Sequence, residues 1–170
     1  GAKVKLITVV GNDSSHTFAE NKLSEFGVTT SLIVDDSRPT TVKQRFRSKG
    51  KTLLRVSHLH QSTISPSLQS IFLRHLISII EKVDLLVFSD FNYGCLPQSL
   101  VDQILTLAKE NNVMLAADSQ SSSQIGDISR FNNMDLITPT EREARVSTRN
   151  NEDGLVVLAE QLRRQSSAEN

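Results

Sequence analysis

An apolar run that stops abruptly at polar residues is the feature that most constrains the fold of this chain. Residues 85–88 read Leu-Leu-Val-Phe, and Ser89 and Asp90 follow directly, just before a glycine-containing turn. This pattern is typical of a buried parallel strand that delivers polar groups to the edge of its sheet. The pattern recurs at 113–118 and at 135–139. We therefore expect an open α/β sheet in which several strand ends form one small-molecule site.

The segments between these strands have helical periodicity. Pro66 and Pro97 stand where helices are expected to begin, and apolar residues follow both at helical spacing. Strands that alternate with helices from residue 81 onward imply right-handed crossovers and a mostly parallel sheet. Residues 85–89 are predicted to be fully buried in it, and the tail at 165–170 is predicted to be frayed.

The first part of the chain predicts a strand, a helix and a second strand. Residues 5–10 and 28–34 have strand character, and Asp13 or Ser14 is placed to cap the helix between them. Gly27 is well placed to end that helix in the left-handed conformation. Its apolar residues at roughly helical spacing are Phe18, Leu23 and Phe26.

Residues 41–57 predict an antiparallel hairpin. Polar and apolar residues alternate over 41–47, a Ser-Lys-Gly-Lys turn follows, and 52–57 pair back. Because an antiparallel pair is unusual among β-α units, we expect a flap or a sheet edge. One face is predicted to hold Val42, Gln44 and Phe46, and the other Thr41, Lys43, Arg45 and Arg47.

Composition limits the classes of function. A chain of 170 residues predicts one domain with a sizeable core, and its net charge of zero indicates neither a nucleic-acid partner nor a membrane surface. Without an apolar run of membrane-spanning length or a signal peptide, a cytoplasmic location is expected. The single Cys95 is expected to be semi-buried rather than a nucleophile, and the four histidines have no metal-ligand spacing. The start at Gly-Ala without Met fits either a scar of tag removal or a piece of a longer protein.

The common nucleotide and catalytic fingerprints are absent, including GxGxxG, GxxxxGK[ST], HExxH, CxxC and GxSxG. Six pieces in order nevertheless resemble the ribokinase-like (PfkB) carbohydrate kinases, especially the heptose 7-phosphate kinases. These pieces are the strand and Gly-Asn-Asp turn at 2–13, Pro-Thr-Thr-Val-Lys-Gln-Arg at 39–45, Leu-Leu-Arg-Val at 53–56, Ser-Asp-Phe-Asn-Tyr-Gly at 89–94, Asp118, and Thr-Pro-Thr-Glu-Arg-Glu at 138–143.

The resemblance implies an α/β fold of three layers, ribokinase-like, with a mostly parallel sheet and the hairpin at about 41–57 as a flap. It implies that residues 1–170 form a single domain that is the central part of a longer kinase domain, incomplete at both ends. Kinases of the family carry a Gly-Gly sugar-binding stretch before this segment and a Gly-Ala-Gly-Asp motif with the catalytic base after it. The isolated segment, which lacks that base, is therefore expected to be inactive.

The family's chemistry is phosphoryl transfer from ATP, with Mg²⁺, to a sugar or sugar-phosphate hydroxyl. The resemblance places substrate contacts at Lys43, Arg45, Asp90 and Asn92. It places the nucleotide side at Asp118, Thr140 and Glu143, with Glu143 ordering Mg²⁺ and its waters. For each residue an ordinary structural role is the alternative, such as a solvated strand face, a turn hydrogen bond or a first-turn helix carboxylate.

Several positions depart from the family pattern. Thr140 replaces an Asn, Tyr93 replaces a Lys, Ser119 and Gln120 replace a Pro-Lys pair, and Ser57 replaces an acidic residue. Two missing lysines weaken charge neutralisation near a phosphate. Two interpretations therefore stay open: a kinase with a divergent substrate, or a degenerate, non-catalytic domain for binding or assembly.

A third interpretation, a flavodoxin-like or receiver-like module, is weaker. Such a module needs a cluster of acidic residues at the end of the first strand, where this chain has Asp13 alone. The hairpin does not belong in such folds either. The expected partners are a sugar or sugar phosphate, without nucleic acid or membrane. A homodimer formed through the flap is implied by the resemblance alone.

Overall fold

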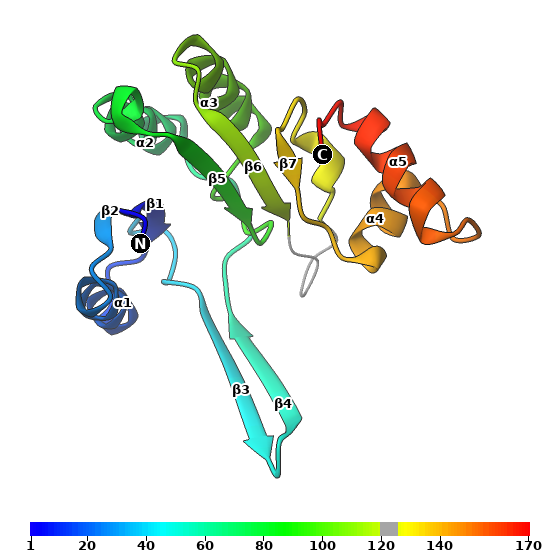
Figure 1. The fold of residues 1–170 in the computed structure, drawn as a ribbon. Helices are drawn as coiled ribbons and strands as arrows, with labels where there is room; N and C mark the ends of the chain where they lie inside the picture. Colours follow the sequence, from blue (N-terminus) through cyan, green and yellow to red (C-terminus); the bar gives the residue numbers. More distant parts are fainter. Residues whose placement is uncertain (120–125) are drawn as a thin grey trace. The chain divides into compact units, whose positions relative to one another are not determined.

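The computed structural model describes residues 1–119 and 126–170 as an α/β protein (Figure 1). The chain divides into two compact units, Gly1–Leu76 and Ile77–Asn170. The first unit contains β1 (Lys5–Val10), α1 (Ser14–Glu25), β2 (Thr29–Val34), β3 (Val42–Ser48), β4 (Lys51–His58) and most of α2 (Pro66–Ile77). The second contains η1 (Ile80–Lys82), β5 (Leu85–Asp90), α3 (Gln98–Glu110), β6 (Met114–Ser119), η2 (Ile128–Arg130), β7 (Leu136–Ile137), α4 (Glu141–Thr148) and α5 (Leu155–Gln165).

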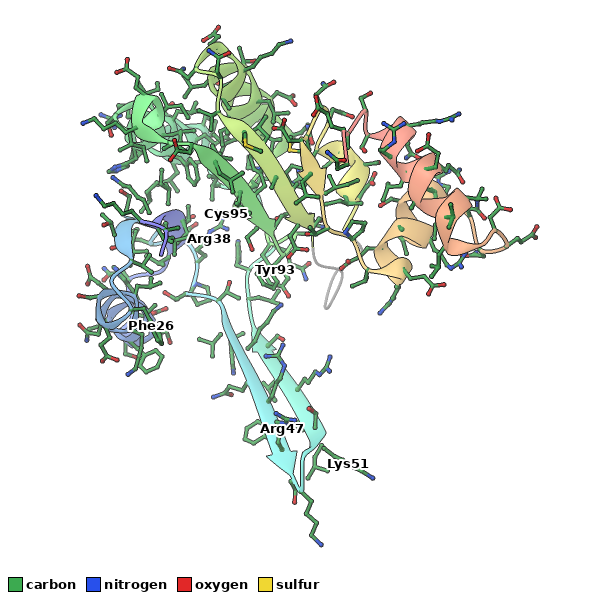
Figure 2. The ribbon with its side chains drawn as sticks, viewed as in Figure 1. Phe26, Arg38, Arg47, Lys51, Tyr93 and Cys95 are labelled. Atoms are coloured by element: carbon green, nitrogen blue, oxygen red, sulfur yellow. The ribbon has the colours of Figure 1, made fainter. Side chains whose placement is uncertain are left out.

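In the first unit the predicted strand, helix and strand are present, and β1 and β2 are parallel neighbours joined through α1. The Asp13 carboxylate caps α1 by accepting a hydrogen bond from the backbone N–H of His16 at 2.9 Å. Gly27 follows the helix at φ +70°, where a side chain would be strained. The apolar residues at helical spacing are not buried, however: Phe18 on α1 is exposed. Phe26, which caps the end of the helix, is exposed too (Figure 2).

The turn after β1 is fastened to the segment that leads into the hairpin. The backbone N–H of Gly11 donates to Oγ1 of Thr40 at 2.9 Å, and the backbone N–H of Thr40 donates to Oδ2 of Asp13 at 2.8 Å. A Cβ atom on Gly11 would lie 2.5 Å from the carbonyl oxygen of Arg38 and 2.6 Å from the backbone nitrogen of Thr40. Only glycine therefore permits this approach of two backbone segments.

A buried ion pair lies beside this fastening. Asp35 accepts from Nε of Arg38 at 2.6 Å, and both side chains are less than a tenth exposed. The Asp35 carboxylate also accepts from the backbone N–H and the hydroxyl of Ser37, at 3.0 and 2.6 Å. Further donors thus satisfy the buried carboxylate, as a buried ion pair requires.

Strands β3 and β4 form the predicted antiparallel hairpin, which extends away from β1, β2 and α1 (Figure 1). Val42 pairs with His58, Phe46 pairs with Leu54, and the register shifts between Phe46 and Arg47. Most hairpin side chains are exposed. A two-stranded ribbon is at best marginally stable by itself in water.

In the second unit, β5, β6 and β7 form a parallel sheet in that order. Its buried face includes Phe88, Leu115 and Ala117, and the rings of Phe88 and Phe131 lie 5.1 Å apart. Helix α3 buries four side chains of its apolar stripe: Leu100, Val101, Ile104 and Ala108. Within the described residues, no helix is long and apolar enough to cross a membrane.

The prediction that residues 85–89 are fully buried is wrong. Burial alternates along β5, and Leu85 and Val87 are half exposed, as is Met114 on the neighbouring strand. A parallel sheet usually has both faces covered, so its strands read as continuous apolar runs. The sequence of β5 is therefore as apolar as that of a strand buried on both faces, although only one face of β5 is buried here.

The prediction of a frayed tail is also wrong. Ser166 is fully buried, and Asn133 donates its backbone N–H to the carbonyl oxygen of Ser166 at 2.9 Å. The backbone N–H of Ile137 donates to the carbonyl oxygen of Asn170 at 3.1 Å, so the tail lies along the outer edge of β7. Long-range backbone bonds of this kind leave no periodic signal in the tail. Residues 119–123 read as a polar loop in the sequence, and they lie outside the described residues except for Ser119, which ends β6.

Candidate active site

The polar strand ends of the second unit lie along one edge of the sheet, which we call the carboxyl edge. Asp90 pairs with Ser119, and Ser89 pairs with Asp118. Beside them, the backbone N–H of Thr138 donates to the carbonyl oxygen of Ala117 at 3.1 Å. Ligands of open parallel sheets bind at this edge, so the expected place for a site exists.

Asp90 and Asp118 nevertheless point to opposite faces. Successive side chains of a strand alternate, and the register pairs Asp118 with Ser89 rather than with Asp90. Asp90 lies on the face of Phe88 and is only 4% exposed. Asp118 lies on the opposite face and is half-buried. The two carboxylates share an edge but do not face one ligand from the same side of the sheet.

Asp90 is held by structural partners. Its Oδ2 accepts from Nη2 of Arg130 at 2.9 Å, and its Oδ1 accepts from the backbone N–H of Asn92 at 2.9 Å. Nη2 of Arg130 also donates to the carbonyl oxygen of Leu96 at 2.9 Å, and its guanidinium carbon lies 4.4 Å from the centre of the Phe131 ring. These contacts fix the turn after β5, in which Asn92 has φ +58°. The turn hydrogen bond that the sequence offers as the structural alternative for Asp90 is thus made with the backbone of Asn92.

Glu143 completes a capping box at the start of α4. Its Oε2 accepts from the backbone N–H of Thr140 at 2.8 Å and from Oγ1 of Thr140 at 2.7 Å. The backbone N–H of Glu143 donates back to Oγ1 of Thr140 at 3.4 Å. The carboxylate is only 6% exposed, so it is not the solvated helix carboxylate that the structural alternative describes. Thr140 and Glu143 thus form one unit directly after β7.

The turn after β5 presents no cation at the position of the family lysine. Tyr93 stands there, is buried, and stacks with Phe91 at a ring distance of 6.2 Å. Cys95 in the same turn is half-buried, as predicted (Figure 2). The turn therefore contributes an aromatic contact where the family has a positive charge.

Lys43 and Arg45 lie on β3, in the first unit. They occupy one face of the hairpin because they are two residues apart. Lys43 is half-buried and Arg45 is exposed. They belong to the first unit, whereas the other predicted site residues belong to the second.

The donors at the carboxyl edge fit a hydrated Mg²⁺ ion rather than a ligand cage. Mg²⁺ prefers oxygen ligands, usually takes one or two carboxylates and keeps several waters. Asp118 and Glu143 are carboxylates of this kind. Among residues 1–119 and 126–170, no group of three or more His, Cys, Asp or Glu is placed to hold a metal by itself. A metal bound here would take its remaining oxygens from water or from a ligand.

Comparison with known proteins decides the family. The model of the pfkB family carbohydrate kinases matches residues 1–168. The chain belongs to this family. It is 31% identical over 148 residues to the bifunctional protein HldE of Helicobacter hepaticus, a match that covers 86% of this chain and 30% of that protein. The predicted resemblance to pfkB kinases is thus confirmed.

Solved structures confirm the ribokinase-like fold of this pfkB chain. Phosphofructokinase-2 from Escherichia coli in complex with potassium matches with a TM-score of 0.73 at 12% identity, covering 99% of this chain and 54% of that one. Ribokinase from Giardia lamblia matches with a TM-score of 0.71 at 16% identity, covering 96% and 49%. The chain spans about a third of the curated relative and about half of these kinases.

Arg130 is the structurally important residue that the sequence does not reveal. It lies forty positions after Asp90 and is the last residue of the 3₁₀ turn η2. Asp127 caps this turn by accepting from the backbone N–H of Ser129 at 2.9 Å. No motif or spacing links Arg130 to Asp90. An arginine next to an aromatic residue is too common a pair to signal this contact.

Proposed function

We propose that the chain is a segment of an ATP-dependent sugar or sugar-phosphate kinase that transfers phosphate to a carbohydrate hydroxyl. The observation that carries the proposal is the pfkB match over residues 1–168, together with the polar strand ends at one edge of a parallel sheet. Sequence identities near 30% to HldE proteins support a sugar-kinase segment. We also propose a cytoplasmic location, which the sequence predicts, and a homodimer, which the family resemblance alone implies.

The proposed nucleotide side consists of Asp118, Thr140 and Glu143. When bound, ATP supplies the phosphoryl group, and Mg²⁺ neutralises the charge that develops on its oxygens. Glu143 would order the water ligands of the metal, and Thr140 would hold Glu143 in place through the capping box. Asp118 would contribute an acceptor at the end of β6.

The proposed sugar side consists of Lys43, Arg45, Asp90 and Asn92. Because the Asp90 carboxylate is already bonded to Arg130 and to the backbone of Asn92, its role is to shape the turn that presents Asn92. We propose no catalytic base within this chain, so turnover by the chain alone is expected to be absent or very slow.

The test is a calorimetric titration of the chain with Mg–ATP, on the wild type and on Glu143→Gln. Glutamine also completes a capping box, so this variant keeps the start of α4 and removes only the charge. Glu141→Gln removes the same charge from the exposed first turn of the same helix and is the matched control. We expect binding that weakens in Glu143→Gln and persists in Glu141→Gln. Equal affinity in all three proteins would contradict the proposed role of Glu143.

A second candidate, a non-catalytic binding or assembly domain, is favoured by a specific observation. Polar residues expected at the site are engaged in structural bonds, and the family lysine of the turn is replaced by the buried Tyr93. This candidate predicts no heat with any nucleotide, whether or not magnesium is present. The same titration therefore separates the two functions.

A further inference from the structure

The short element η2 (Ile128–Arg130) forms hydrogen bonds with two parts of the second unit that carry predicted site residues. One part is the turn at 91–96, which connects β5 to α3 and contains Asn92. The other is helix α4, which begins with the capping box of Thr140 and Glu143. A 3₁₀ helix of one turn has poor hydrogen-bond geometry of its own, so contacts with its neighbours determine where it lies.

Arg130 holds the turn at both of its ends. Its Nη2 donates to Oδ2 of Asp90, the last residue of β5, and to the carbonyl oxygen of Leu96, both at 2.9 Å. Its Nη1 donates to Oε1 of Gln98, the first residue of α3, at 3.2 Å. Between these ends, Asn92 has φ +58° and donates its backbone N–H to the Asp90 carboxylate at 2.9 Å. The position of Arg130 therefore determines whether the two ends of the turn are held together.

The start of η2 is bonded to α4. The backbone N–H of Ile128 donates to Oγ of Ser147 at 3.2 Å, and both residues are buried. Gln165 of α5 adds a second link, because its Nε2 donates to Oγ of Ser129 and to the carbonyl oxygen of Ser147, both at 3.1 Å. Ser147 follows Glu143 by four residues, so the two lie on one face of α4. Hydrogen bonds and rigid helices of this kind carry energetic coupling between sites.

We infer that η2 couples the two sides of the proposed site, and that Arg130 is a positioning residue that acts on the turn at 91–96 through Asp90. The nature of the ligands rests on the proposed function, whereas the coupling is a property of the bonded segments alone. A ligand that fixes the start of α4 stabilises the position of η2 and therefore the closed turn. By thermodynamic linkage, a ligand bound to the closed turn strengthens binding at α4 by the same factor.

Amide hydrogen exchange of Asn92, followed by NMR, measures opening of the turn, because this N–H is bonded to Asp90 in the closed form. Two variants each remove one link between η2 and the helices and leave the turn itself unchanged. Ser147→Ala removes the oxygen that accepts from η2. Gln165→Ala removes the bridge from α5, and because Gln165 is exposed, this variant leaves the core intact.

Each variant has a matched control on the same helix. Thr148→Val removes a neighbouring hydroxyl of α4 that donates to the carbonyl oxygen of Ala144 within the helix. Gln161→Ala removes an amide of α5 that accepts from Nδ2 of Asn150 rather than bonding to η2. Circular dichroism verifies that every variant is folded. A difference between a variant and its control therefore reports the link to η2 and not the loss of a side chain.

Three results support the coupling. Ser147→Ala and Gln165→Ala each accelerate exchange at Asn92 about three- to tenfold, the size expected for one lost hydrogen bond, and the controls do not. Arg130→Lys, which keeps the charge beside Asp90 but loses the planar fork, accelerates exchange less than Arg130→Met. Saturating Mg–ATP slows exchange at Asn92 in the wild type, and slows it less in Ser147→Ala.

Two results overturn it: exchange at Asn92 that is unchanged in both Ser147→Ala and Gln165→Ala, or exchange that the controls accelerate equally. Either would make Arg130 a local contact of the turn. The variants are compared without a ligand, so the kinase proposal is tested separately. If the variants open the turn but Mg–ATP never binds, the kinase proposal fails and the coupling stands. If Mg–ATP protects the start of α4 but leaves Asn92 of the wild type unchanged, the coupling is wrong and the kinase proposal stands.

Discussion

Single side chains decide whether a polar strand end is available to a ligand. Asp90 and Asp118 look equivalent in the sequence, because each follows an apolar run. Only Asp90 is nearly inaccessible, between Arg130 and the backbone of Asn92. The local pattern predicts that polar groups reach the edge of the sheet. It cannot predict which of them a distant arginine will hold, because that contact depends on the tertiary fold.

Arg130→Met tests the structural role of the Asp90 contact. Loss of the guanidinium leaves a buried carboxylate without its counter-charge, which costs about 3–5 kcal/mol in comparable sites. Urea denaturation monitors the free energy of unfolding, with Arg142→Met at an exposed position of α4 as the control. The double change Asp90→Asn with Arg130→Met is expected to restore part of the loss. Equal stability of Arg130→Met and the control would show that the pair is dispensable.

Gly11→Ala tests the fastening of the β1 turn to the start of the hairpin. The added carbon meets backbone atoms of Arg38 and Thr40, which cannot rotate away. We expect a loss of about 1–3 kcal/mol, the range for overpacked sites. At Gly154 no atom lies within 4 Å of an added carbon, so Gly154→Ala is the control and loses less. Thermal unfolding compares the two, and an unchanged midpoint for Gly11→Ala would contradict the close approach.

Elements with a strong local period are those that the sequence predicts well. The hairpin, the helices that begin near Pro66 and Pro97, and the strand order along the chain all appear where periodicity places them. The features that escape prediction depend on neighbours. The open face of β5 depends on what covers the sheet, and the anchored tail depends on β7.

Two carboxylates in the turns after β1 and β2, Asp13 and Asp35, are expected to make the stability of the fold depend on pH. Backbone N–H groups of Thr40 and His16 hold the pKa of Asp13 below its usual value. Burial pushes the pKa of Asp35 upward, but hydrogen bonds from Ser37 and the charge of Arg38 outweigh it, so that pKa is also lowered. A carboxylate whose pKa is lower in the folded state stabilises the fold above its unfolded pKa of about 3.9. That stabilisation is lost as the pH falls through the folded pKa.

The unfolding free energy is therefore expected to decrease steadily below about pH 4 and to be nearly constant around neutrality. Asp13→Asn and Asp35→Asn should flatten this decrease, and both should be less stable than the wild type at neutral pH. Glu160, whose pKa is lowered to about 2 by hydrogen bonds from Arg163 and Arg164, serves as the comparison. Urea titrations at several pH values give the slopes. Identical slopes for wild type and variants would exclude Asp13 and Asp35 as the source.

For the whole molecule, the exposed apolar face of the β5–β6–β7 sheet has a measurable consequence. Leu85, Val87 and Met114 are 50–58% exposed side by side on neighbouring strands. Large contiguous apolar patches bind hydrophobic dyes and favour association. Val87→Thr with Met114→Gln should reduce dye fluorescence and concentration-dependent association without lowering the unfolding midpoint. Val156→Thr at an exposed position of α5 is the control, and equal dye binding in both proteins would refute the patch.

The central claim is that the carboxyl edge of the second unit is the nucleotide side of a pfkB kinase segment. Hydrogen–deuterium exchange of the chain with and without saturating Mg–ATP tests it most directly. The account predicts slower exchange at the end of β6, residues 117–119, and at 138–144, and unchanged exchange in α1. Protection confined to other elements, or none at saturation, would contradict it.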